Sequence, residues 1–145
     1  MFRFDVRQAI NAMGYAQVLV ENPGIANIAE SRHHGPFNMV MFPYADINLM
    51  GTSQFDRSEL GELRHLLLDL QRMTRIGNWV TTWERELVEG DDTAGVVVDA
   101  LEQGIISLED DSETAIDVIR DHGIREQFEA EWESSTARLS AESTT

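Results

Sequence analysis

The chain has 145 residues, 42% of them apolar, which is enough for one folded domain with a hydrophobic core. Its formal net charge of −15 makes nucleic acids and anionic membranes unfavourable partners, because like charges repel. The absence of cysteine excludes disulfides and thiolate metal sites, and no run of 18 apolar residues is present to span a membrane.

Apolar residues recur with helical spacing along almost the whole chain, and no alternating strand pattern is present. The first helix is expected over residues 4–20, ended by the Asn-Pro pair at 22–23. A second, short helix over 24–33 meets the Gly-Pro pair at 35–36. Residues 37–50 are largely apolar, and Pro43 is expected to kink or end a helix there.

A long helix follows a loop at residues 51–53. Ser58 can cap it, and leucines then repeat at spacings of three and four up to Val88. Gly90 supplies the expected C-terminal stop.

Further helices are expected over the remaining sequence. One spans residues 93–103, and a variant capping box at 107–110 opens the next, which should break near 122–123 and resume to about Arg138. The acidic run at 110–113 fits a helix N-terminus, with metal binding as its alternative. We therefore predict a single all-α domain over 1–138 and a disordered tail over 139–145.

Three polar residues in the long helix stand out by their spacing. Asn78, Thr82 and Glu86 place an amide, a hydroxyl and a carboxylate four residues apart. On a helix these residues drift only about 80° around the axis over a rise of about 12 Å, so they share one face. Three oxygen ligands plus waters suit Mg²⁺, which often carries substrate phosphates. Arg85 adds a positive charge beside the carboxylate.

The line of these residues continues a stripe of leucines upstream, which favours a helix entering a polar cavity. The alternative is that all three lie on a solvated surface, as most charged residues do. The apolar and aromatic residues at 37–44 likewise fit either the wall of an apolar ligand cavity or plain core.

The segment 78–91 resembles the metal-binding NSE motif of class I terpene synthases. In that family an Asn, a Ser or Thr, and a Glu bind one of three Mg²⁺ ions that hold a prenyl diphosphate. The resemblance implies that Asn78, Thr82 and Glu86 are metal ligands and that Arg85 contacts the diphosphate.

Arg32 lies 46 residues before Asn78, the spacing of the family's diphosphate-sensing Arg, in a similar sequence context. In the family this stretch precedes a helix broken in the middle, for which Pro43 is the candidate. With the segment 100–110, the resemblance covers about residues 20–135. It implies an all-α bundle like the C-terminal half of the isoprenoid synthase fold, with catalytic roles for Arg32 and Arg85.

The family's aspartate-rich motif has no counterpart, since the only Asp before Arg32 is Asp5. The trinuclear Mg²⁺ cluster that ionises a prenyl diphosphate needs carboxylates on two walls. We therefore expect a lyase that is incomplete as a single chain, and whose partners are a prenyl diphosphate or pyrophosphate. A second chain supplying the missing motif, or a homo-oligomer, could complete it.

The rival hypothesis is a non-catalytic, acidic helical interaction protein from a halophile. All eleven basic residues are arginine, and an acidic protein without lysine resembles proteins from organisms with a salt-rich cytoplasm. An acidic mesophilic protein is the other reading. On the halophilic reading most carboxylates serve solubility rather than catalysis. No signal-peptide pattern is visible, so a cytoplasmic location is expected.

Overall fold

The computed structural model describes residues 1–142, and every regular element in that part of the chain is a helix, which confirms the all-α prediction. None of the described helices is both long and apolar enough to cross a bilayer. The α-helices are α1 (Phe2–Glu21), α2 (Ile28–His34), α3 (Met41–Met50), α4 (Leu60–Val88), α5 (Gly95–Glu102), α6 (Ser112–Asp121) and α7 (Ile124–Glu142). Short 3₁₀ turns connect some of them: η1 (Pro23–Ile25), η2 (Gly35–Met39) and η3 (Arg57–Glu59).

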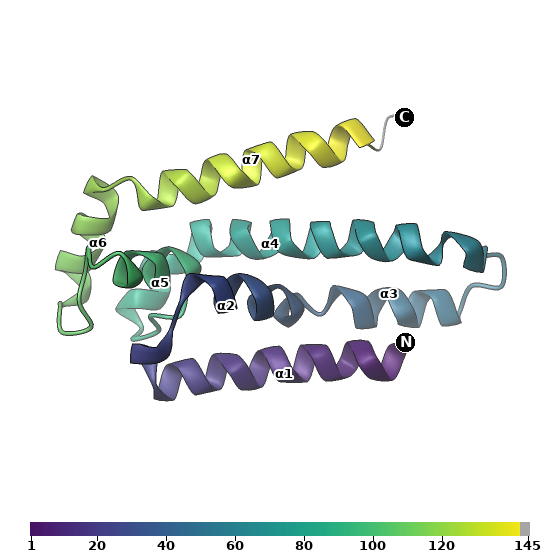
Figure 1. Cartoon of the computed structure of the whole chain (residues 1–145), viewed down its shortest axis with the longest axis horizontal. Helices are drawn as coiled ribbons and strands as arrows, with labels where there is room; N and C mark the ends of the chain where they lie inside the picture. Colours follow the sequence, from purple (N-terminus) through teal and green to yellow (C-terminus); the bar gives the residue numbers. More distant parts are fainter. Residues whose placement is uncertain (143–145) are drawn as a thin grey trace.

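The long elements form a layered bundle. In Figure 1, α1, the segment α2–η2–α3, α4 and α7 lie side by side in that order, and direct contacts join α1 to η2, η2 to α4, and α4 to α7. α1 and α4 run in one direction, whereas α2–α3 and α7 run in the opposite one. α5 and α6 close the end of the bundle at which α4 finishes.

The hydrophobic core lies at this closed end. Trp79 and Trp83 of α4 are almost fully buried, and Phe128 of α7 meets the Trp79 ring edge-on at 6.0 Å between centroids. The run Val96–Val98 is fully buried inside α5. The C-terminal half of α4, which carries Asn78, Thr82 and Glu86, is therefore the half that packing holds most firmly.

The segment α2–η2–α3 contains the expected break, but the predicted position of that break, at Pro43, is wrong. Pro43 is the third residue of α3 and lies inside it. Proline is tolerated in the first turn because the amide hydrogens there have no intrahelical acceptor. The chain instead breaks at η2, where Pro36 stands near its start and Val40 takes a left-handed φ of 59°. That backbone is unfavourable for a β-branched residue, so the surrounding packing must hold it.

Other helix boundaries also differ from the predictions, and the second helix begins at Ile28 rather than at residue 24, after the turn η1. Asp56, rather than Ser58, caps the turn before α4 by accepting the Ser58 amide at 2.9 Å. The box at 107–110 forms a turn, in which the Ser107 amide donates to Asp110 at 2.7 Å, and α6 begins only at Ser112. Its cap is Asp111, which accepts the Thr114 amide, so the acidic run does serve a helix N-terminus.

The last helix also runs further than expected. α7 extends to Glu142, four residues past the predicted end at Arg138. Leu139 is buried, which gives this extra turn an apolar contact. The predicted tail is therefore helical over 139–142, and residues 143–145 lie outside the described part of the chain.

Candidate anion pocket and the polar face of α4

The three predicted metal ligands lie on a continuous stretch of α4 and are all half-buried. The Thr82 hydroxyl donates to the Asn78 carbonyl at 2.7 Å, which leaves its oxygen lone pairs available as acceptors. No group of three or more His, Asp or Glu side chains among residues 1–142 is placed to hold a metal. A metal at this face would therefore depend on the Asn78 amide and Thr82 hydroxyl oxygens as well as on Glu86.

A cation of the protein already lies beside this face. Arg75, one turn before Asn78, donates from Nη1 to the Asn78 Oδ1 at 2.9 Å. Burial lowers the pKa of Arg75, and the charges of Glu86 and Asp91 partly oppose that shift. Arg75 is thus bonded to the amide of the predicted ligand set and carries a charge opposite to that of its carboxylate.

Arg75 also borders a cavity of about 350 Å³ between α2, η2, α4 and α7. Two further arginines, Arg32 and Arg72, line the same cavity together with His33, whereas Glu131 is its only carboxylate. Such a concentration of positive groups is unusual in a chain of charge −15 and favours an anionic ligand. The remaining lining residues are Ala29, Pro36, Ile76 and Trp79.

Arg32 is held in this cavity by α7. Its two terminal nitrogens donate to the two carboxylate oxygens of Glu131 at 2.6 and 2.9 Å, and its guanidinium lies over the Phe128 ring at 5.0 Å. Both members of the ion pair are 40% exposed, so solvent and solutes reach it. The fork geometry of Arg32 is the one that recognises carboxylate and phosphate oxygens, and Glu131 occupies the place of such a ligand.

Several polar atoms around Arg75 are buried without a hydrogen-bond partner in the described chain. They include Arg75 Nε and Trp79 Nε1, whose residues line the main cavity. The Tyr15 hydroxyl and Ser31 hydroxyl are in the same state and line a second cavity of about 20 Å³ next to Arg75. An entering anion or water would satisfy donors of this kind, which otherwise carry a desolvation cost.

Arg85, the predicted diphosphate contact, is not part of this cavity. Its side chain is 68% exposed and faces Glu89 at 3.8 Å. It lines a different groove, between α4 and α6, that is rich in carboxylates. The structure therefore separates Arg85 from Arg32, although the sequence resemblance assigns both to one diphosphate.

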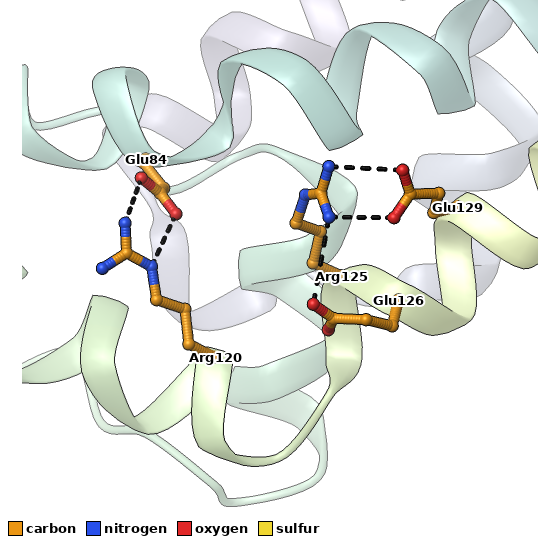
Figure 2. A network of polar contacts seen from close by, with 5 residues as sticks. All are labelled: Glu84, Arg120, Arg125, Glu126 and Glu129. Carbon is orange, nitrogen blue, oxygen red and sulfur yellow. Dashed lines mark hydrogen bonds and ion pairs between the residues drawn. The ribbon is translucent and has the colours of Figure 1, made fainter.

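Ion pairs fasten the end of α4 near this groove (Figure 2). Arg120 of α6 donates to both carboxylate oxygens of Glu84 at 2.9 and 2.8 Å. Arg125, at the start of α7, pairs with Glu129 at 2.8 Å and with Glu126 at 3.9 Å. These bonds fix α6 against α4 and stiffen the first turns of α7, which carries Glu131.

The structure thus forms two polar regions that share Arg75. Arg75 is hydrogen-bonded to Asn78 and feels the charge of Glu86, and it lines the same cavity as Arg32. Sequence reasoning missed Arg72, Arg75 and Trp79. Their spacing of three and four residues just before and after Asn78 was a usable signal, because it places them on neighbouring positions of one helix.

Comparisons with protein-family models, with curated protein sequences and with solved structures gave no match to this chain.

Proposed function

We propose that the chain binds the diphosphate group of a prenyl diphosphate, together with Mg²⁺, in the manner of one half of a class I terpene synthase. The observation that carries the proposal is the cavity lined by Arg32, Arg72, Arg75 and His33 with a single carboxylate. A diphosphate offers several anionic oxygens to these donors. The apolar lining beside them suits the start of a hydrocarbon chain.

The chemistry of the α4 face fits Mg²⁺, since Asn78, Thr82 and Glu86 offer hard oxygen atoms on one side of a helix. The Asn78 oxygen is hydrogen-bonded to Arg75, so the ion would compete with that bond. When bound, Mg²⁺ supplies charge neutralisation for the departing diphosphate. The arginines bind and orient the anion, and Trp79 and Ile76 keep water away from its buried side.

The test uses calorimetry with pyrophosphate and compares two opposite variants of one ion pair. Arg32→Gln removes a fork donor and should weaken pyrophosphate binding about tenfold, the effect of one charge-assisted hydrogen bond. Glu131→Gln removes the carboxylate that competes for Arg32, so it should tighten binding by a similar factor. Arg57→Gln, an exposed arginine in η3, serves as the control and should bind like the native protein.

The role of Mg²⁺ is tested separately. Mg²⁺ should strengthen pyrophosphate binding by the native protein, and Glu86→Gln should remove that enhancement while leaving metal-free binding intact. Absence of pyrophosphate binding by the native protein in both conditions would overturn the proposal.

A separate assay tests for catalysis. The protein is incubated with C10, C15 and C20 prenyl diphosphates, alone and with a chain carrying an aspartate-rich motif, and the release of pyrophosphate is measured.

A second candidate function is that of a non-catalytic interaction protein. The observation in its favour is the exposure of large apolar side chains, eleven of the fifteen being in the first fifty residues. Exposed apolar surface of this kind marks interaction sites. An intact fold that binds no pyrophosphate would favour this function over the first.

A further inference from the structure

The outer face of α1 has no covering element in the described chain. α1 forms one edge of the bundle in Figure 1 and packs inward through Ala9, Ala12 and Leu19. Large apolar side chains nevertheless occur around its outer side as well. Those exposed on α1 are Phe2, Phe4, Ile10, Met13, Val18 and Val20, and Ile10 is 60% exposed.

Charge distinguishes this region from the rest of the molecule. The first fifty residues hold four carboxylates and three arginines, whereas the other ninety-five hold twenty-two carboxylates and eight arginines. A second copy of the same chain is repelled by the acidic region, and it meets almost no net charge at the α1 side. An acidic chain can therefore self-associate through α1 at little electrostatic cost.

The outermost positions of α1 form a regular seam. Their spacings alternate between four and three residues, which is the heptad repeat of a helix pair. All of them are exposed in the single chain. The seam consists of Arg3, Arg7, Ile10, Gly14, Gln17 and Glu21.

The seam of one copy is complementary to the seam of a second copy that runs in the opposite direction. When two copies of α1 run antiparallel about a two-fold axis near residue 12, Arg3 of one faces Glu21 of the other. In the same register Ile10 faces Gly14, where an added Cβ would meet nothing within 4 Å, so the glycine leaves room for the isoleucine. Gln17 donates to the Glu21 carboxylate at 2.9 Å, so neighbouring seam positions are already linked on the outer side.

We propose that the outer face of α1 is the interface of a two-fold homodimer, in which the two α1 helices pack antiparallel with Arg3 opposite Glu21 of the second copy. Isologous pairing brings Ile10 of each copy to the centre of the interface and joins two near-neutral surfaces. The proposal is independent of the proposed diphosphate site, which lies between α2, η2, α4 and α7.

Sedimentation equilibrium over a concentration series tests the dimer, at one fixed salt concentration. The native chain should dimerise, and Arg3→Glu or Glu21→Arg should each raise the dissociation constant about tenfold by placing like charges opposite each other at two symmetric sites. The double variant Arg3→Glu/Glu21→Arg exchanges the partners and should restore the native value. Matched controls on the opposite edge, Arg138→Glu and Glu133→Arg on α7, should leave dimerisation unchanged.

Cysteine cross-linking tests the antiparallel register, because the chain has no cysteine of its own. Position 7 should face position 17 of the second copy, ten residues or about 15 Å further along the helix. A mixture of the Arg7→Cys and Gln17→Cys proteins should therefore form the mixed disulfide, and neither protein alone should form one efficiently. A monomeric native chain, a double exchange as weak as either single variant, or cross-linking of Arg7→Cys to itself would each overturn the proposal.

Discussion

At the scale of single residues, two carboxylates compete for one arginine at the open end of the bundle. Asp5 of α1 is buried, and both its oxygens accept bonds from Arg64 of α4 at 2.8 Å, while Asp46 of α3 lies 4.0 Å from the same guanidinium. Burial alone would raise the pKa of Asp5, but the bonds and the positive charge of Arg64 oppose it and the pKa is lowered. Burial and the neighbouring Asp5 raise the pKa of Asp46.

The raised pKa of Asp46 predicts that Asp46→Asn increases the thermal stability of the protein in a pH-dependent way. A raised folded-state pKa means that the group favours folding at low pH, and that this contribution is lost as the pH rises through the raised value. Asn cannot ionise, so the variant should melt a few degrees above the native chain at neutral pH. The gain should vanish below the ordinary Asp pKa of 3.8, where both forms are neutral.

Thermal melts followed by circular dichroism across this pH range provide the measurement. Glu133→Gln, an exposed carboxylate on α7, is the control and should change the melting temperature little at any pH. A variant that is less stable than the native chain at neutral pH would contradict the charge competition described for Asp5 and Asp46.

At the scale of helices, a close approach of α5 to α4 sets the position of the polar face. Gly95, the first residue of α5, lies against the indole of Trp79, and an added Cβ would stand 2.6 Å from Cδ2 of that ring. Trp79 is 2% exposed and cannot move aside without disturbing the core. The contact between Gly95 and Trp79 therefore helps to position the residues of α4 near Arg75.

Gly95→Ala should destabilise the protein by about 2 kcal/mol, because overfilling a packed core forces side chains or backbone to shift. Denaturant unfolding measures the change. Gly61→Ala, near the start of α4 with open space around an added Cβ, is the matched control and should stabilise slightly or have no effect. Equal stability of the native and Gly95→Ala proteins would mean that this contact is not tight.

At the scale of the whole molecule, the distribution of charge dominates. Residues 51–142 carry most of the negative charge, the main core cluster and most of the ion pairs, whereas the first fifty residues are near neutral and more apolar on their surface. Net charge far from zero destabilises a compact state by self-repulsion. The arginine cavity reduces this repulsion locally, since three arginines and only one carboxylate line it.

Added salt should therefore raise the melting temperature of the native chain from its value at low ionic strength, because the repulsion between surface carboxylates is screened. A variant with Glu109→Gln, Asp121→Asn and Glu133→Gln should start from a higher melting temperature at low salt and gain less from added salt. A melting temperature that falls with sodium chloride would show that attractive ion pairs outweigh the repulsion.

Local signals in the sequence determined most of the helices and their ends. The glycines at 90, 104 and 123 all take the positive φ values that end helices, and the helical period correctly predicts one long helix containing Asn78, Thr82 and Glu86. The break in the second layer was predicted at Pro43 and occurs at η2 instead, since a proline in the first turn is harmless and the left-handed Val40 depends on packing.

The sequence by itself could not decide which charges meet. Arg32 binds Glu131, ninety-nine residues away, and only the packing of α2, α4 and α7 brings it to the same cavity as Arg72 and Arg75. The same packing leaves Arg85, which is adjacent to Glu86 in sequence, in a separate groove. Residue patterns act over one or two turns of a helix, whereas a pocket is formed by side chains from elements that meet only when the tertiary structure closes.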